Sequence, residues 1–318
     1  MKNLLIIGGS YFLGRIFVES LAQNNNYRIY IVNRGNRPLN MQGVVELKCD
    51  RNDITGLKAL LPKLLWHAVI DFCAYTPQDV NNLFLVLPRK TVSHYIFIST
   101  VSVYAPTKSL PIKEGSPTLT GPQPELGPAA NYGYQKSLAE KAITIQCRYN
   151  HIPFTSLRPG IIYGKYNYGP RESYFFDLIR KKQSTVIPEN DLPLFQFISV
   201  WDAAQIIVLC MGNPDTYNKT FNLCAPELIS YGRLIEILEV ISGWPISKRF
   251  MSASEIDKKK IPLPFPLDSH LIYSGELIQQ TLGFKYNSLI EGMRETYEWY
   301  DNNIKASVEE DLPWKKND

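Results

Sequence analysis

A tyrosine and a lysine four residues apart form the most chemically suggestive pair in the chain. Tyr132 and Lys136 open an amphipathic run, and on a helix this spacing places the phenol and the ammonium on one face. A phenol can exchange a proton with a substrate oxygen, and a nearby ammonium favours the phenolate. A second pair at this spacing, Tyr104 and Lys108, has Pro106 between its members and cannot lie on a regular helix. The first pair therefore makes the chain look like an enzyme, and the segments around it, rather than the spacing alone, turn it into evidence.

Two other segments are expected beside this pair. The glycine loop from Gly8 to Gly14 follows a short apolar run and opens a helical pattern, an arrangement that offers free amides and a positive dipole end to a pyrophosphate. A plain glycine turn is the simpler alternative. Thr100 ends another strand-like run, so in a parallel sheet it would reach the same carboxyl edge as the start of a helix at Tyr132.

Short β-branched runs alternate with helical patterns through the first half of the chain. This alternation predicts an α/β fold with a doubly wound parallel sheet of the Rossmann type. The predicted strands are 4–7, 28–32, 44–48, 68–72, 95–99 and 154–157, and the predicted helices begin at Phe12, near Thr76-Pro77 and at Tyr132.

Beyond Pro159 the pattern changes to loops rich in proline, tyrosine and glycine. We expect a dinucleotide-binding domain over residues 1–164 and a mainly substrate-binding lobe over 165–318, with some elements returning to the first sheet. The charged tail from Val308 is expected at the surface or disordered. The later elements are predicted at 174–181, 195–200, 221–224, 231–242 and 288–303.

The composition excludes several other classes of protein. In 318 residues, 45% hydrophobic and 20% charged residues are typical of a globular domain, and a diffuse net charge of +4 argues against nucleic-acid binding. The five cysteines and four histidines are scattered, which predicts neither a disulfide framework nor a metal site and favours a cytoplasmic protein. The apolar run at residues 4–7 is too short for a signal peptide or a membrane span.

Further motifs extend along almost the whole chain. In order with the glycine loop and with Tyr132 and Lys136, they are Ile98-Ser99-Thr100, Val103-Tyr104, Leu157-Arg158-Pro159-Gly160, Tyr163-Gly164, Val200-Trp201-Asp202, Phe221-Asn222-Leu223, Leu282 to Lys285, and Trp299-Tyr300. Taken together and in this order, the motifs resemble the extended short-chain dehydrogenase/reductase family. That family is associated with nicotinamide-dependent epimerases, dehydratases and reductases, which are commonly dimeric, so the resemblance implies an NAD(P)-dependent enzyme and a homodimer.

The resemblance also implies roles for individual residues. Tyr132 would be the general acid/base, Lys136 would favour its phenolate and hold the nicotinamide ribose, and Thr100 would bind the reacting oxygen. The hydroxyl of Thr100 could instead be satisfied by a neighbouring carbonyl, and Asp50 could be a helix cap or turn residue. The implied cofactor-binding residues are Gly8, Ser10, Tyr11, Phe12, Leu13, Gly14, Asn33, Arg34, Asp50, Cys73, Ala74, Tyr132, Lys136 and Pro159.

Some positions depart from the family pattern. Tyr11 replaces the middle glycine of the loop, which resembles an atypical branch of the family. Arg34 follows the second strand without an acid to bind a ribose 2′-hydroxyl, and with Arg37 it could pair a 2′-phosphate, so NADP is favoured over NAD. Ile161 and Phe195 stand where nucleotide-sugar enzymes commonly carry an Asn and an Arg for the substrate diphosphate. Nucleotide sugars are therefore not assumed.

Two functions stay open at this point. The first is an epimerase or reductase that transfers hydride at a hydroxyl or keto carbon of a small molecule, such as a sugar derivative. The second is a non-catalytic nucleotide- or RNA-binding protein on the same fold, because the atypical loop resembles relatives implicated in RNA binding and fold alone does not fix function. A complete set of Tyr132, Lys136 and Thr100 favours the first.

Overall fold

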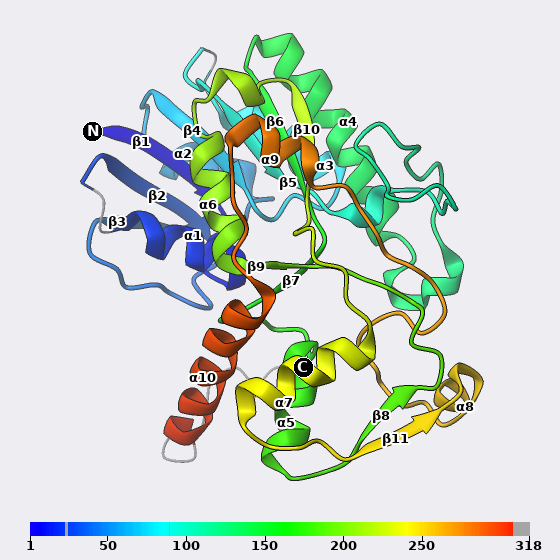
Figure 1. Ribbon diagram of the computed structural model, residues 1–318. Helices are drawn as coiled ribbons and strands as arrows, with labels where there is room; N and C mark the ends of the chain where they lie inside the picture. Colours follow the sequence, from blue (N-terminus) through cyan, green and yellow to red (C-terminus); the bar gives the residue numbers. More distant parts are fainter. Residues whose placement is uncertain (23–24, 89, 308–318) are drawn as a thin grey trace. The chain divides into compact units, whose positions relative to one another are not determined.

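The computed structural model describes residues 1–22, 25–88 and 90–307, which form two compact units that alternate along the chain (Figure 1). The first unit comprises 1–162, 200–226 and 273–286, and the second comprises 163–199, 227–272 and the described residues from Asn287 onward. Two late segments thus complete the first unit. The functional roles assigned to residues 1–164 and 165–318 stay predictions, and the tail from Val308 lies outside the described residues.

The first unit is built on a seven-stranded parallel sheet in the order β10-β6-β5-β4-β1-β2-β3. This confirms the predicted doubly wound sheet, with the strand order reversing between β1 and β4, where ligands of such folds bind. The strands are β1 (Lys2–Ile7), β2 (Tyr27–Asn33), β3 (Val44–Lys48), β4 (Trp66–Asp71), β5 (Tyr95–Ile98), β6 (Phe154–Pro159) and β10 (Lys219–Leu223).

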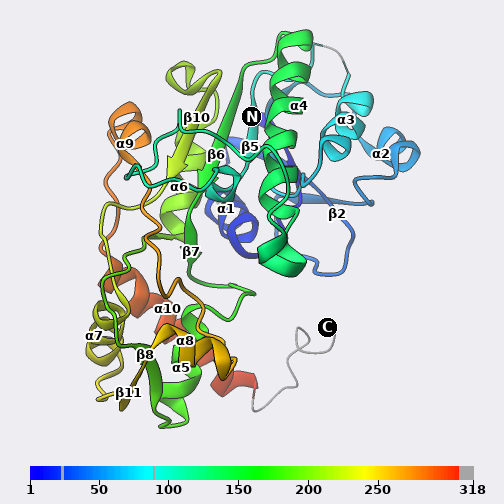
Figure 2. The same ribbon diagram turned by 90° about the vertical axis from the view of Figure 1, so that its right-hand side faces the viewer.

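Helices cover both faces of this sheet, as Figure 2 shows. Helices α1 (Phe12–Ala22) and α6 (Val200–Cys210) pack together on one face, and α2 (Ile54–Leu60), α3 (Pro77–Val86) and α4 (Tyr132–Asn150) pack on the other. Helix α3 begins at a capping box in which Thr76 and Asp79 bind each other's backbone amides, with Pro77 in the first turn. Helix α9 (Glu276–Leu282) packs against β10.

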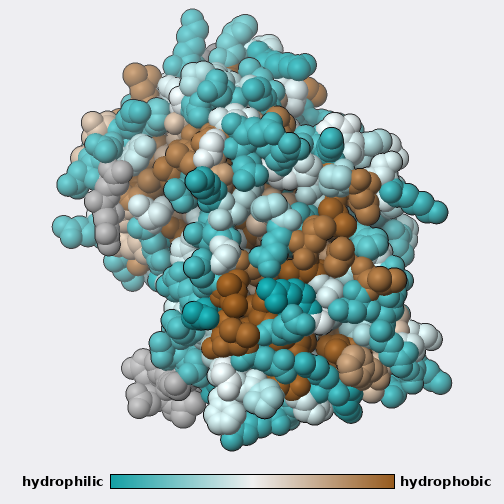
Figure 3. All heavy atoms as spheres, viewed as in Figure 1, coloured by the Kyte–Doolittle hydropathy of each residue, from teal (hydrophilic) through white to brown (hydrophobic). Residues whose placement is uncertain are grey.

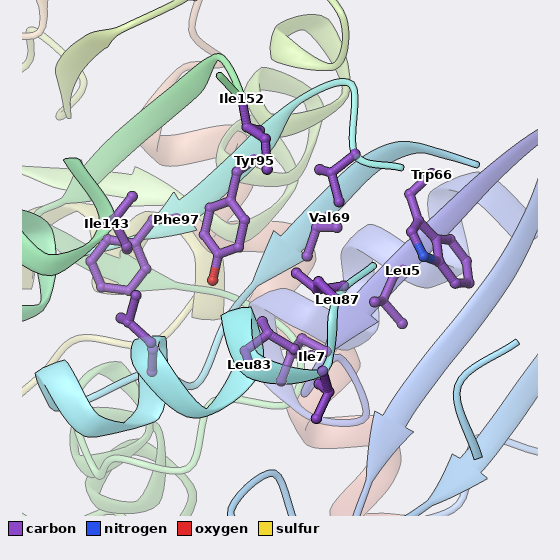
Figure 4. Packing of buried hydrophobic residues seen from close by; sticks show 14 of the residues in the cluster. Leu5, Ile7, Trp66, Val69, Leu83, Leu87, Tyr95, Phe97, Ile143 and Ile152 are labelled. Atoms are coloured by element: carbon purple, nitrogen blue, oxygen red, sulfur yellow. The ribbon is translucent and has the colours of Figure 1, made fainter. Parts of the chain in front are cut away.

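The core under α3 and α4 is aliphatic and aromatic (Figure 4). Trp66 and Tyr95 are fully buried, and the Trp66 ring meets Tyr30 edge-on at 5.3 Å between centroids. Tyr95 lies among the labelled apolar side chains with its hydroxyl pointing away from its own strand. A buried phenol needs a hydrogen-bond partner. For Tyr95 this partner is a charged group at the sheet edge, described below.

The second unit has its own aromatic core. Phe195 stacks on Phe265 at 4.8 Å, and Phe197 and Tyr231 pack around them. Its elements are β8 (Thr185–Pro188) paired in parallel with β11 (Lys248–Met251), β9 (Phe197–Ser199), α5 (Glu172–Arg180), α7 (Tyr231–Ser242), α8 (Ala253–Lys258) and α10 (Leu289–Ser307). A short strand, β7 (Ile161–Tyr163), stands where the chain passes from the first unit to the second.

The sequence analysis did not predict α2, β7, β8, α8, β11 and α9, and it assigned the wrong type of element near residue 200. The predicted strand 195–200 is shortened to β9, and Val200 begins α6, a helix that the sequence analysis did not predict. Seven of the eleven residues of α6 are buried, so its apolar pattern is nearly continuous and lacks the polar stripe that marks a surface helix.

Hydrophilic residues cover much of the face drawn in Figure 3, with smaller apolar areas among them. Among the described residues, no helix is both long and apolar enough to cross a membrane.

Candidate active site

The glycine loop lies at the carboxyl end of β1 and leads into α1. Gly8 and Gly9 have φ of +89° and +88°, a conformation that side chains rarely adopt. A Cβ on Gly9 would lie 2.7 Å from Ile6, and one on Gly14 would lie 2.6 Å from the Gly9 Cα atom. These three glycines therefore let the chain turn tightly and bring the N-terminus of α1 to the sheet edge.

The other predicted residues of the loop divide into two groups. Phe12 and Leu13 are buried in the core, so only their main chain could meet a cofactor. Ser10 and Tyr11 are half-buried. The guanidinium carbon of Arg37 lies 3.7 Å from the centroid of the Tyr11 ring, a cation–π contact. The residue that replaces a glycine thus holds an arginine beside the loop.

The side chain of Asn33 at the end of β2 is committed to its own loop. Its amide donates to Glu46 Oε2 at 2.9 Å, and its oxygen accepts from the Gly35 amide at 2.8 Å. Glu46 Oε1 accepts from two further amides, those of Leu39 and Asn40. The sequence analysis missed Glu46 because it comes from the neighbouring strand, β3. These bonds shape the loop that carries the exposed Arg34.

Asp50 takes the turn role that the sequence left open. It is exposed, and its carboxylate accepts from the Asn52 amide at 2.8 Å, which is an Asx turn. The cap of α2 is a different residue, Asp53, which accepts from the Gly56 amide. No contact of Asp50 in the structure points to a ligand, so its cofactor role stays a prediction.

A buried charge pair that the sequence analysis did not find lies beside the loop. Arg51 donates two hydrogen bonds to Asp71, at 2.8 and 3.0 Å, and Tyr95 donates one at 2.8 Å. Burial opposes the charged form of Asp71, but Arg51 and the hydrogen bonds outweigh it and lower the pKa of this carboxyl. Asp71 is 20 positions from Arg51 and 24 from Tyr95, so no local sequence pattern predicts these contacts.

Asp71 also shapes the segment that follows β4. Its Oδ1 atom accepts from the amides of Cys73 and Ala74 at 3.0 and 2.9 Å. The Cys73 sulfur lies 3.3 Å from the position of a Cβ on Gly8, so this predicted cofactor residue does border the glycine loop. Burial, followed by the Asp71 charge, raises the pKa of the Cys73 thiol to about 11, so it stays protonated.

Lys136 is buried, although lysine is almost never fully buried without partners. Its ammonium donates to the carbonyls of Ala74 at 2.9 Å and Ile98 at 2.6 Å, at the carboxyl ends of β4 and β5. It also lies 4.4 Å from the Phe97 ring centroid and 5.2 Å from that of Tyr75. Burial lowers the pKa of Lys136 to about 8. Lys136, the lysine of the predicted pair, therefore lies at the carboxyl edge of the sheet.

Tyr132 is the first residue of α4, one turn before Lys136. Its side chain is 41% exposed, and its ring centroid is 6.3 Å from that of Tyr75. Gly133 lies against the carbonyl of Ser102, where a side chain would clash. This close approach fixes the start of α4 against the short helix η1 (Val101–Val103), directly after Thr100. The structure thus brings Tyr132 and Thr100 onto adjoining elements.

The hydroxyl of Thr100 has local partners, as the simpler alternative allowed. It caps η1 by accepting from the Ser102 amide at 3.2 Å and donates to the Ser102 hydroxyl at 3.2 Å. Ser102 is exposed, so this second bond is open to exchange. The neighbouring Ser99 hydroxyl is buried and has no hydrogen-bond partner among the described residues.

A second buried network explains the Leu-Arg-Pro-Gly motif. Arg158 on β6 pairs with Glu140 of α4 at 2.6 and 2.9 Å and donates to Tyr104, which donates to Asn222 at 2.6 Å. These bonds tie α4 to the sheet one turn beyond Lys136. Pro159 is buried at the end of β6 and has no side-chain donor, so only its position at the carboxyl edge supports its predicted role.

The described residues contain no group of three potential metal-ligating side chains. The sheet edge does hold a glycine loop, an ammonium, a phenol and hydroxyls, which suit nucleotide binding and proton exchange.

A family model, the NAD dependent epimerase/dehydratase family, matches residues 4–224. The chain belongs to this family. Membership confirms the expected enzyme class, an NAD-dependent epimerase or dehydrogenase, over the alternative of a binding protein.

Individual relatives are distant. The chain is 25% identical over 313 residues to the chloroplast stem-loop binding protein of 41 kDa b of Arabidopsis thaliana, covering 93% of this chain and 78% of that protein. It is 23% identical over 295 residues to the UDP-glucose 4-epimerase of Vibrio cholerae, covering 84% and 79%. Among solved structures, the UDP-glucose 4-epimerase of Thermotoga maritima with UDP-glucose matches with a TM-score of 0.78 and 18% identity, covering 95% and 99%, which supports the fold of the family.

Proposed function

We propose that this protein is an NAD(P)-dependent epimerase or reductase that acts at a hydroxyl or keto carbon of a small molecule through Tyr132, Lys136 and Thr100. The observation that carries the proposal is the buried ammonium of Lys136 between the ends of β4 and β5, one helical turn from Tyr132. Burying an ammonium is costly, and a functional site is a common reason to do so.

The residues around the glycine loop fit a dinucleotide. Positive φ at Gly8 and Gly9 turns the chain sharply after β1, so the N-terminus of α1, whose dipole suits an anion such as a pyrophosphate, lies at the sheet edge. We assign the main chain of Ser10 to Leu13 to this contact, and the Cys73–Ala74 segment to the border of the same site. When bound, the nicotinamide accepts or donates the hydride.

The protein's own part is proton transfer. Tyr132 gives a proton to the substrate oxygen or takes one from it, and it is accessible enough for a substrate to reach. The positive charge of Lys136 favours the phenolate of Tyr132. Thr100 exchanges its bond to Ser102 for one to the substrate oxygen, which orients the reacting carbon. The hydroxyl of Ser99 is a second candidate at this edge to bind the substrate oxygen.

For the cofactor we propose a preference for NADP. Arg34 and Arg37 are both exposed on the loop after β2, and Glu46, the acid that binds this loop, already accepts three hydrogen bonds. Replacing Arg34 by Ser is expected to weaken NADP binding about tenfold, or about 1.4 kcal/mol, and to leave NAD binding unchanged. Calorimetry with both nucleotides tests this, and a tenfold preference of the wild type for NAD would contradict it.

We propose that the substrate is a sugar derivative. If it carries a diphosphate, the side chain of Phe195 does not bind that group. Phe195 is fully buried in an aromatic cluster, so no cation is available there. Relatives named as UDP-glucose 4-epimerases make nucleotide sugars the first compounds to test. The protein is incubated with NAD or NADP and with free or nucleotide-linked sugars, and epimers are separated by chromatography. No conversion in any combination would count against the enzyme.

We also propose a cytoplasmic homodimer. All five cysteines are free, which suits a reducing compartment. Leu85 on α3 and Ile145 and Tyr149 on α4 are large apolar side chains with exposures of 66–70%. Ile145→Glu is expected to yield monomers by light scattering, whereas the equally exposed Leu65→Glu elsewhere on the unit is not. Monomeric wild type would overturn this assignment.

A further inference from the structure

We propose that the buried Arg51–Asp71–Tyr95 group is a positioning device for Lys136, because it fixes the carbonyl that receives the ammonium and supplies the negative charge that keeps the ammonium protonated. The inference deepens the proposed function and rests on the role given there to Lys136. It assigns these three residues, none of which lies in a motif of the chain, to control of the site.

The positional part of the device runs through the main chain. Asp71 Oδ1 accepts from the amides of Cys73 and Ala74, which folds the segment after β4 into a tight turn. The Ala74 carbonyl then accepts from the Lys136 ammonium at 2.9 Å. Asp71 itself cannot move, because Arg51 binds both of its oxygens and Tyr95 binds one of them from within the core.

Arg51 is held as tightly as its partner. Besides Asp71 it donates to the Asp79 carbonyl at 3.0 Å and to the Cys73 sulfur at 3.3 Å. One guanidinium therefore joins the loop after β3, the end of β4 and the start of α3. A purely structural ion pair is often no better than apolar residues of the same shape, so a buried pair at this edge calls for a further reason.

The electrostatic part of the device concerns the charge of Lys136. Burial favours the neutral amine, and the Asp71 charge is the largest influence in the opposite direction. Among the other titratable or charged groups, Glu140 also favours the ammonium and Arg51 disfavours it, whereas the nearby Cys73 thiol stays protonated and carries no charge in this pH range. The rings of Phe97 and Tyr75 favour a cation.

The pair thus explains how a buried lysine remains a cation near neutral pH. A charged Lys136 is the form that favours the Tyr132 phenolate and can donate to a cofactor hydroxyl. Loss of the Asp71 charge would remove the largest influence that favours the ammonium and leave Arg51 with only the more distant Asp79 carboxylate, so Lys136 would lose its proton at a lower pH. A role limited to packing would not change this titration.

The test is a carbon-13 NMR titration of lysine labelled at Cε, with Lys136 assigned by loss of its signal in Lys136→Met. In the wild type, Lys136 is expected to titrate near pH 8, apart from exposed lysines. Asp71→Asn keeps an oxygen for the Cys73 and Ala74 amides but removes the charge, and it is expected to lower the midpoint by at least about one pH unit. An unchanged or raised midpoint would overturn the proposal.

Asp71→Asn removes the closer of the two carboxylates beside the buried Arg51 and leaves only Asp79, at 3.7 Å, so this variant is the one at risk of not folding. The double variant Arg51→Met with Asp71→Asn removes both charges of the pair and leaves Asp79 with its hydrogen bonds from Tyr75 and Thr76. Its midpoint is expected to fall by a smaller amount, because Asp71 acts on Lys136 more strongly than Arg51 does. A double variant that folds and titrates like the wild type would also contradict the proposal. His94→Gln, a buried change at the opposite edge of the sheet, is the control for destabilisation alone and should leave Lys136 unchanged.

The titration needs no cofactor and so separates this proposal from the proposed function. If the wild type binds neither NAD nor NADP, the proposed function fails. The shift of the Lys136 midpoint still tests whether Asp71 controls the charge of Lys136. If nucleotide binds, its pH profile in Asp71→Asn should move in the same direction as the NMR midpoint.

Discussion

At the scale of single residues, the proposed mechanism gives Tyr132 the proton transfer and Lys136 the supporting positive charge. Lys136 is enclosed by carbonyls and rings, whereas Tyr132 is accessible at the start of α4. Tyr132→Phe removes only the hydroxyl that moves the proton, so turnover is expected to fall by roughly 100-fold while nucleotide affinity stays within about twofold. Steady-state kinetics and calorimetry measure the two quantities.

Lys136→Met serves as the matched comparison and should reduce both quantities, because it removes the positive charge beside the phenol and a donor to the ribose. Wild-type turnover in Tyr132→Phe would remove this tyrosine from the chemistry.

These two residues were visible in the sequence because their spacing is local, and so were the glycines of the loop. Arg51 and Asp71 were not, since the contact between them joins the loop after β3 to the end of β4, two strands that β1 and β2 separate in the sheet. The local role of Asn33 was also hidden, because its side-chain amide is satisfied by Glu46 and Gly35, which only the folded loop brings within reach. The turn role of Asp50, which accepts from the Asn52 amide, was one of the alternatives that the sequence left open.

At the scale of elements, the position of the N-terminus of α4 depends on Gly133, which has no side chain. Gly133 lies against the Ser102 carbonyl, so a methyl group there must push α4 away from η1. Gly133→Ala is expected to lower turnover at least about tenfold, because Tyr132 and Thr100 would separate by a few tenths of an ångström or more.

Gly121→Ala is the control for this change, since open space surrounds a Cβ at that position. The account of this edge is wrong if Gly133→Ala retains full turnover.

Prediction succeeded for the six strands up to Pro159 and was less complete for the helices and for the elements after Pro159. The ends of β3 and α7 were predicted to the residue, since polar and turn residues bound both elements. Helix α6 was missed because seven of its residues face other elements, which gives it the apolar run expected of a strand.

At the scale of the whole molecule, acid should weaken the fold through His94. His94 is fully buried; one ring nitrogen pairs with the Thr155 hydroxyl at 2.9 Å and the other accepts from the Gly212 amide at 3.2 Å. A proton on the accepting nitrogen would face that amide. Burial, followed by the nearby His67, lowers the pKa of His94 to about 4, so the unfolded chain binds this proton more readily than the folded one.

The contribution of His94 is therefore present above about pH 6.5 and is lost as the pH falls toward about 4. Between about pH 7.5 and 5.5 it should cost about 1 kcal/mol of unfolding free energy, measured by urea titration. His94→Gln should be less stable at the higher pH but lose correspondingly less on acidification. The exposed His151→Asn should behave like the wild type, and an equal acid response in all three proteins would refute the assignment.

The central claim is that the edge of the sheet at the glycine loop binds a nicotinamide dinucleotide. Isothermal titration of the folded wild-type protein with NADP and NAD, in oxidised and reduced forms, tests it most directly, because it requires neither a substrate nor a known direction of reaction. The account predicts saturable one-site binding with a dissociation constant of roughly micromolar to sub-millimolar size, with NADP at least as tight as NAD. Folded protein that binds none of the four nucleotides would contradict it.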